Sequence, residues 1–324
     1  MNQMESIPLR PIDSSKRLLV VFPHPDDESF GPGGTLARYA REGVAVHYAC
    51  ATRGEVGSVT PDLLKPFEHL PEDQRLGALR EGELRCAAEQ LGLAGLHLLG
   101  YRDSGMVGTA ENRDARAFVN ADVDQVTGQL VQLIRAIKPQ VMITFDPYGG
   151  YGHPDHIFAH HRTNDAFRAA GDPARYPDAG APYQPQKLYW TAFSQSWLKW
   201  FVRLMPLFGR DPSKFGRNKD VDLRQIAAYA YPYPVTTTID VWPYYPVKTA
   251  ASACHASQAG PAAAFRNLPR WLVRRVFGYE RFTRVEPAPN GRRPLERDLF
   301  EGVNEHMRCS LPSRSGGAPV NGWV

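Results

Sequence analysis

A histidine and three acids stand together directly after an apolar run near the start of the chain. Residues 18–22 are apolar, and they are followed by Pro23, His24, Pro25, Asp26, Asp27 and Glu28. Burying unpaired charge costs several kcal/mol, so a cluster of this kind normally has a metal or a charged partner. Imidazole and carboxylate groups bind divalent metals, which makes His24 and Asp27 candidate ligands and Asp26 a candidate base. The stretch predicts a metal-dependent hydrolase.

A second polar group follows another apolar run, at 141–145. It reads DPYGGYGHPDH over residues 146–156. Catalytic zinc typically has three protein ligands and one open position, so His24, Asp27 and one histidine of this loop would complete a site. Spacing alone does not choose between His153 and His156, and His160 is a third candidate. The other loop histidine could donate to an oxyanion, with Asp155 orienting one of the two.

The elements around these loops predict an α/β fold. We expect buried strands at 16–22, 44–52, 96–99 and 141–145, because their apolar residues are continuous rather than alternating. Helices are expected at 33–42, 78–91, 123–137 with Asp122 as the N-cap, and 155–169. Later strands are expected at 187–192 and 235–240, and a helix at 247–258. In a Rossmann-like, mostly parallel sheet, ligands bind outside the carboxyl ends of the strands, so the two polar loops should meet at one edge.

Length and composition fit one catalytic domain with flanking segments. We expect an N-terminal extension at 1–15, a catalytic domain at 16–258, and a C-terminal appendage with a flexible tail at 259–324. Hydrophobic residues make up 43% and charged residues 22%, and a net charge of +4 is too small to indicate nucleic-acid binding. The chain shows no signal peptide and no apolar run of membrane-spanning length.

The four cysteines, Cys50, Cys86, Cys254 and Cys309, are dispersed, which favours reduced thiols and a cytoplasmic protein. The aromatic segment 197–208 is expected to form core, a subunit contact or a cover over the pocket rather than a membrane anchor. Homo-oligomerisation is left open.

Several motifs together resemble one enzyme family. They read PHPDDE at 23–28, RDSGM at 102–106, GGYGHPDH at 149–156 and KLYWT at 187–191. The pattern is similar to the LmbE-like, or PIG-L-like, N-acetylglucosaminyl deacetylases, and within them to the branch that deacetylates the glucosaminyl-inositol precursor of mycothiol. That branch includes mycothiol conjugate amidases, and the bacillithiol-pathway deacetylases are related. The resemblance runs from residue 17 to residue 258.

The resemblance implies roles for individual residues. It implies zinc, one ion per chain, although another divalent metal such as Fe²⁺ could take its place. The metal ligands would be His24, Asp27 and His156, the catalytic residues Asp26, His153, Asp155 and Tyr151, and the substrate-binding residues Arg80, Asp103, Met106 and His255. Glu28 is either a partner of the site residues or an acid favoured near a helix N-terminus, and no later motif gives it a necessary part. Two departures are Pro23, where the family more often has alanine, and Ser257, which replaces a threonine in an HxTQ element.

The predicted reaction is hydrolysis of the N-acetyl amide of an N-acetylglucosaminyl glycoside with release of acetate. The aglycone would be inositol or malate, in the synthesis of a low-molecular-weight thiol. Alternatives within the same chemistry are an amidase of thiol S-conjugates and a deacetylase of other glycosides. An alternative of another class is a non-catalytic sugar-binding module, against which the base beside a full ligand set argues. A peripheral enzyme of inositol lipids is a third.

Overall fold

The computed structural model of the chain describes residues 4–10, 12, 14–192, 195–214, 222–228, 233–258, 269–289 and 296–304, without the side chains of 195–198 and 208. Its described strands form one sheet of order β1-β4-β3-β2-β5-β6-β8-β7. They are β1 (Glu5–Pro8), β2 (Arg17–Phe22), β3 (Ala45–Thr52), β4 (Gly95–Tyr101), β5 (Val141–Thr144), β6 (Lys187–Ala192), β7 (Thr237–Asp240) and β8 (Tyr279–Glu286). The central strands β4, β3, β2, β5 and β6 pair in parallel, whereas β1, β8 and β7 join antiparallel.

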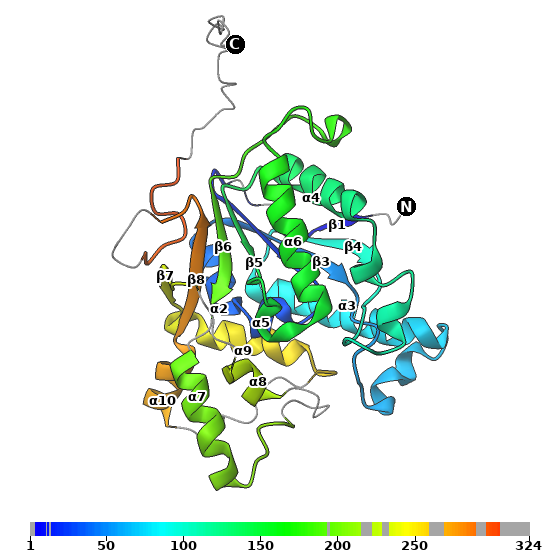
Figure 1. The fold of residues 1–324 in the computed structure, drawn as a ribbon, viewed down its shortest axis with the longest axis vertical. Helices are drawn as coiled ribbons and strands as arrows, with labels where there is room; N and C mark the ends of the chain where they lie inside the picture. Colours follow the sequence, from blue (N-terminus) through cyan, green and yellow to red (C-terminus); the bar gives the residue numbers. More distant parts are fainter. Residues whose placement is uncertain are drawn as a thin grey trace, which may run out of the picture.

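Helices cover both faces of this sheet (Figure 1). On one face α2 (Gly33–Arg41), α3 (Glu72–Leu91) and α9 (Tyr245–Cys254) pack over a core that includes Val20 and Phe22 of β2. On the other face α4 (Val123–Ile137) and α6 (Pro154–Ala169) pack over a core that includes Leu19 and Val21. Alternate residues of one strand thus enter two different cores, which is why the strand is apolar throughout. The expected α/β fold is confirmed.

Shorter elements connect these layers. The short α-helices are α1 (Asp27–Phe30), α5 (Gly149–Gly152), α7 (Gln195–Leu204), α8 (Leu223–Ala228) and α10 (Arg270–Phe277). The 3₁₀ turns are η1 (Pro61–Phe67), η2 (Glu111–Arg113), η3 (Phe118–Asn120), η4 (Pro177–Ala179), η5 (Met205–Phe208) and η6 (Trp242–Tyr244). No described helix is long and apolar enough to cross a membrane.

The predicted helices form, with shifted ends. Asp122 caps α4 as expected, because its carboxylate accepts the N–H of Gln125 at 2.8 Å. Helix α3 begins at Glu72, six residues before its predicted start. Glu72 and Asp73 lie in its first turn, where negative charge favours helix formation. The segment between β3 and α3 is therefore shorter than the predicted ends leave it, and η1 occupies part of it.

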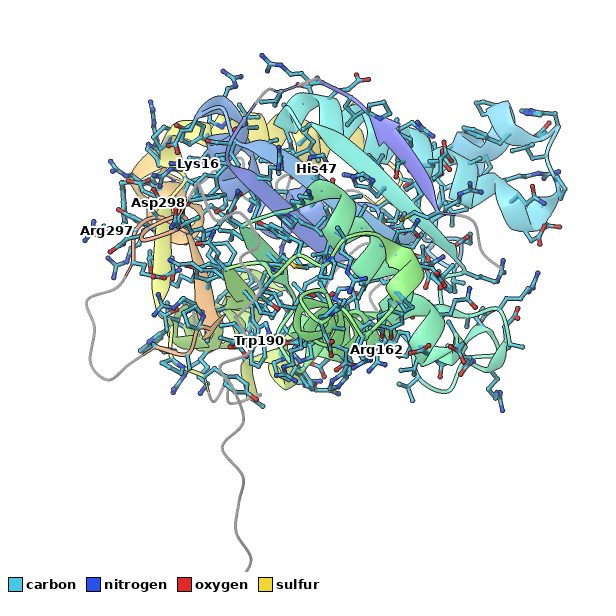
Figure 2. The ribbon with its side chains drawn as sticks, turned by 90° about the horizontal axis from the view of Figure 1, so that it is seen from above. Lys16, His47, Arg162, Trp190, Arg297 and Asp298 are labelled. Carbon is cyan, nitrogen blue, oxygen red and sulfur yellow. A yellow bond between two sulfur atoms is a disulfide. The ribbon has the colours of Figure 1, made fainter. Side chains whose placement is uncertain are left out.

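The C-terminal region beyond residue 258 does not lie wholly outside the sheet. Strand β8 lies between β6 and β7, so the expected boundary at 258 does not coincide with an edge of the sheet. Glu296 ties the following segment down, since its carboxylate accepts from Lys187 at 3.1 Å and Thr237 at 2.8 Å and pairs with Arg284. The labels of Lys16, Arg297 and Asp298 group on one side of Figure 2, where this segment returns against α2. Residues 1–3 of the expected N-terminal extension and the predicted tail from 305 lie outside the described residues.

The expectation of reduced cysteines is wrong for one pair. Cys86 of α3 and Cys254 at the end of α9 form a disulfide across 168 residues of sequence. The spacing of the two cysteines in the sequence does not predict this bond, because the pairing depends on two helices packing side by side on the same face of the sheet. Cys50 is a free, buried thiol, and Cys309 lies outside the described residues.

Candidate active site

The three predicted metal ligands converge at the carboxyl ends of β2 and β5. His24 lies two residues after β2, Asp27 begins α1, and His156 lies in the first turn of α6. His24 Nδ1 lies 3.1 Å from His156 Nε2, and the Asp27 carboxylate lies 3.7 Å from the first and 3.6 Å from the second. Two loops separated by about 130 residues thus place two nitrogens and a carboxylate around one point.

In each imidazole, the nitrogen that donates a hydrogen bond to the protein determines which nitrogen is left as an acceptor. His156 Nδ1 lies 3.0 Å from the carbonyl oxygen of Gly149, so it donates its hydrogen there. His24 Nε2 lies 3.2 Å from the carboxylate of Asp155 and donates in that direction. The other two nitrogens, His24 Nδ1 and His156 Nε2, face each other across 3.1 Å beside the Asp27 carboxylate, so a proton or a cation must lie between them. The donor set is one that zinc and similar divalent metals accept.

Two other groups of buried residues also bring possible ligand atoms within 4.8 Å of one another. One adds His153 to His24 and His156, and the other joins His24 with Asp103 and Asp155. In the second group both carboxylates face Nε2 of His24, at 3.2 and 3.6 Å, and accept backbone N–H groups as well. Carboxylates in that position orient a histidine through its second nitrogen, which leaves Nδ1 as the nitrogen that could bind a metal.

Burial and mutual charge displace the proton affinities of these groups. Burial lowers the pKa of His156 well below its usual value, and the neighbouring His24 adds to the effect. Burial raises the pKa of Asp27 to about 8, although His24 opposes it. Burial would also lower the pKa of His24, but Asp103 and the other carboxylates outweigh it and raise that pKa. A bound cation would favour the ionised carboxylate and the neutral imidazoles, which are the ligand forms.

Asp26, the predicted base, lies beside the ligands in a strained conformation. Its φ is +115°, in the left-handed region that non-glycine residues rarely adopt. The Arg80 guanidinium donates to its carboxylate at 3.0 Å and to the carbonyls of Pro25 and Gly54 at 2.6 and 2.9 Å. Burial raises the pKa of Asp26, against the opposing charge of Arg80. Arg80 is thus already bound to the protein, next to the base.

His153 lies on the other side of the cluster, with its ring centroid 4.6 Å from that of His24. It caps α6: its Nδ1 accepts the backbone N–H of Asp155 at 3.2 Å. The ring hydrogen is therefore on Nε2, which makes that nitrogen a donor. Burial, together with His24, lowers the pKa of His153 to about 4.

Asp155 and Tyr151 take up positions around this histidine. The carboxylate of Asp155 contacts His24, and its bond to His153 is made by its backbone N–H, so it supports both rings by different atoms. The Tyr151 ring lies at the mouth of the site, 36% exposed, with its centroid 5.9 Å from that of His153.

Glycines in the second loop allow it to fold this closely around His156. Gly149 has φ +65°, and a Cβ on it would lie 2.6 Å from the Cβ of His156. Asp146 holds the turn by accepting the N–H of Gly150 at 2.8 Å. Only a residue without a side chain fits at position 149. His160, the third histidine considered, donates instead to the carbonyl of Phe145 at 2.8 Å, away from the cluster.

The residues expected to bind substrate do not all lie beside the histidine cluster. Asp103 is buried, and its carboxylate lies 3.6 Å from Nε2 of His24. Met106, three residues later in the sequence, is 38% exposed. His255 is completely buried, and its Nε2 lies 2.6 Å from Glu28.

Sequence reasoning left the role of Glu28 open and did not single out Glu55. Glu28 is fully buried, and Glu55 accepts the N–H of Asp103 at 3.1 Å. The position of Glu28 inside the first motif was the sequence signal for its role. Glu55 lies in a polar loop and carried none.

Comparison with known proteins shows the family of the chain. The sequence profile of PIG-L, described as GlcNAc-PI de-N-acetylase, matches residues 19–167. A 1D-myo-inositol 2-acetamido-2-deoxy-alpha-D-glucopyranoside deacetylase of Streptomyces avermitilis is 40% identical over 296 residues, which cover 89% of this chain and 97% of that protein. The chain belongs to the PIG-L family. Its motifs at 23–28 and 149–156 both lie within the matched region.

Solved structures share the PIG-L fold at lower identity. An N,N'-diacetylchitobiose deacetylase from Pyrococcus horikoshii has a TM-score of 0.57 at 19% identity, covering 85% of this chain and 88% of that one. A 4-carboxy-2-hydroxymuconate hydratase from Pseudomonas putida has a TM-score of 0.54 at 20% identity, covering 86% and 100%. These matches show the fold alone, and a fold that carries both names does not by itself specify the reaction.

Proposed function

We propose that this protein is a zinc-dependent hydrolase that removes the acetyl group from an N-acetylglucosaminyl glycoside. The observation that carries the proposal is the pair of facing imidazole nitrogens, His24 Nδ1 and His156 Nε2, with Asp27 beside them and the acid Asp26 next in sequence. A ligand set of this kind leaves room for water and a substrate carbonyl. The name of the Streptomyces avermitilis relative supports inositol as the aglycone.

The residues divide the work of amide hydrolysis. His24, Asp27 and His156 would hold zinc, which when bound supplies an acidified water and a polarised carbonyl. Asp26 takes a proton from the attacking water and passes it to the departing amine nitrogen, so that the C–N bond breaks to give acetate and free amine. Its buried setting and raised pKa suit a group that must both accept and release a proton.

His153 supports the proposed reaction as a neutral hydrogen-bond donor. Because its Nδ1 accepts from the helix backbone, its Nε2–H is available to an oxyanion without a change of tautomer. Asp155 keeps His24 in orientation, and Tyr151 is placed to contact the acetyl carbonyl or the sugar from the exposed side. Asp103 and Met106 remain proposed substrate contacts.

A substrate panel tests the proposal. Zinc-loaded protein would be given N-acetylglucosaminyl-inositol, N-acetylglucosaminyl-malate and a thiol S-conjugate amide, with acetate and free amine measured. We expect the inositol glycoside to be cleaved with the highest kcat/KM. Turnover of the S-conjugate alone would reassign the protein as an amidase, and turnover of none would refute the assignment. A cytoplasmic location stays part of the proposal, although the Cys86–Cys254 disulfide removes the argument from reduced thiols. Cell fractionation checks it.

Asp26→Ala separates catalysis from metal binding. The variant should lose turnover by at least about 100-fold, the usual contribution of a general base. Its zinc content should stay close to that of the wild type, because the proposed ligands are unchanged. Wild-type turnover in this variant would remove Asp26 from the mechanism.

A further inference from the structure

Glu28 and His255 form a buried carboxylate–imidazole pair that is hydrogen-bonded to the backbone of Asp26. Glu28 Oε1 lies 2.6 Å from Nε2 of His255, and the same oxygen accepts the hydroxyl of Ser29 at 2.6 Å. Glu28 and His255 are both completely buried. The second oxygen of Glu28 accepts the backbone N–H of Asp26 at 3.0 Å. The pair is therefore connected to the proposed base by one hydrogen bond.

The charges of the pair support each other. Burial would raise the pKa of Glu28, but His255 outweighs it and lowers that pKa. Burial would lower the pKa of His255, but Glu28 outweighs it and raises that pKa. A buried carboxylate and imidazolium at hydrogen-bond distance form a strong, directional contact, and removing one partner would leave an uncompensated charge.

Asp26 needs such a contact because its backbone is strained. A non-glycine residue in the left-handed region costs on the order of 1–3 kcal/mol, and it persists only where surrounding contacts hold it. The Asp26 carbonyl accepts from Ser29 and Phe30 at 3.0 and 2.9 Å, and its N–H is held by Glu28. Glu28 thus holds the amino side of the strained residue, while Arg80 holds its carboxylate.

Helix α3 fixes the other end of the pair. Glu83 accepts the N–H and the hydroxyl of Ser257 at 2.7 and 2.6 Å, and Cys86 is bonded to Cys254. His255 is therefore held by contacts on both sides. Arg80, Glu83 and Cys86 are three residues apart and share one side of the helix. One stretch of α3 consequently supports both the carboxylate of Asp26 and His255, the partner of Glu28.

We propose that Glu28 and His255 are positioning residues that hold the Asp26 carboxylate in its working place. The pair acts through Asp26 and does not touch the substrate, which would revise the expectation that His255 binds the sugar. The exposed fraction of His255 is zero, and its ring is directed at Glu28. This inference rests on the proposed function of Asp26 as the base.

Glu28→Gln tests the inference by removing the charge while keeping the shape. We expect kcat to fall about 10- to 100-fold, the range typical of residues that orient a site. KM and zinc content should change little. In an Asp26→Ala background the same change should have no further effect on residual turnover, because the pair works only through Asp26. An equal loss in both backgrounds would overturn the inference.

Glu296→Gln is the matched control. Glu296 is also a largely buried carboxylate, paired with Lys187 and Arg284, but it lies in the C-terminal segment. Its replacement should lower stability without changing the pH profile of kcat, whereas Glu28→Gln should alter that profile. If Glu28→Gln does not fold, Ser257→Ala weakens the same support more gently and should also lower kcat with KM unchanged.

A crystal structure of the Glu28→Gln variant gives a readout independent of activity. We expect φ of residue 26 to leave the left-handed region, or its carboxylate to move away from Arg80. An unchanged Asp26 would overturn the positioning role even if the enzyme is a deacetylase. A displaced Asp26 in a protein whose wild type cleaves no amide would keep the structural role and refute the proposed function instead.

Discussion

At the scale of single residues, the site is defined by which nitrogen of each histidine is already occupied. His156 and His24 each donate from one nitrogen to the protein, which leaves the other free toward a common point. His153 shows the reverse arrangement, because its Nδ1 accepts from the helix backbone and its Nε2 is left as a donor. Three histidines close together thus have two distinct capabilities, metal binding and hydrogen-bond donation.

His153→Ala should lower kcat by about 100- to 1000-fold, the usual cost of removing an oxyanion donor. Zinc content should be retained, because His153 is not among the three proposed ligands. His156→Ala is the comparison, and it should lose the metal together with the activity. Metal analysis and steady-state kinetics on both variants check the assignment. Loss of zinc in His153→Ala with retention in His156→Ala would exchange the two roles.

At the scale of elements, the strand ends and the turns that follow them position the chemistry. His24 and the turn into α1 follow β2, and the glycine-rich turn into α6 follows β5. The turn after β5 is sterically the more restricted. Its Gly149 carbonyl must reach Nδ1 of His156, and a Cβ on Gly149 would collide with the Cβ of His156. Glycine at 149 is therefore a requirement of the site rather than of the sheet.

Gly149→Ala should displace His156 and weaken zinc binding by at least about 10-fold, the range seen when the supports of a metal ligand are lost. Gly43→Ala is the control: it has a similarly positive φ of +85°, but a Cβ there would meet no atom within 4 Å. It should cost stability alone. Zinc affinity measured by competition with a chelator, beside urea unfolding, separates the two effects. Equal zinc affinity in both variants would contradict the account.

Much of this arrangement was predictable from sequence because its signals are local. Apolar runs predicted β2 and β5, and the polar residues directly after the first run predicted His24 and Asp27 as ligands. The choice of His156 over His153 and His160 came from the family resemblance and not from spacing. The pairing of Glu28 with His255 was not predictable, since it joins residues 227 positions apart through the packing of α9. The disulfide between Cys86 and Cys254 and the place of β8 in the sheet depend on long-range packing in the same way.

At the scale of the whole molecule, titratable groups are enclosed at both ends of the sheet. Opposite the site, His47 of β3 and His97 of β4 stack near the amino ends of their strands, with Nδ1 of the first 3.2 Å from Nε2 of the second. Burial, with the nearby Arg17, lowers the pKa of His47 to about 4. Burial, with His47, lowers the pKa of His97 to about 3.

Both histidines should make the protein less stable in acid. Their folded pKa values lie below the ordinary value of 6.5, so between pH 6.5 and about 3 the unfolded chain binds more protons. The free energy of unfolding should therefore fall as the pH drops below 6.5, and these two groups should not affect it above that. Urea unfolding from pH 7.5 to 4.5 measures the slope. A His47→Gln/His97→Gln double variant with an undiminished slope would contradict the assignment.

The most direct test of the central claim is removal and return of the metal. Acetate release from N-acetylglucosaminyl-inositol would be measured on the protein as isolated, after exhaustive chelation, and after titration with Zn²⁺. We predict that chelation abolishes turnover and that one equivalent of zinc per chain restores it, but not in the His156→Ala variant. Full turnover by the metal-free protein would contradict the claim that His24, Asp27 and His156 hold a catalytic metal.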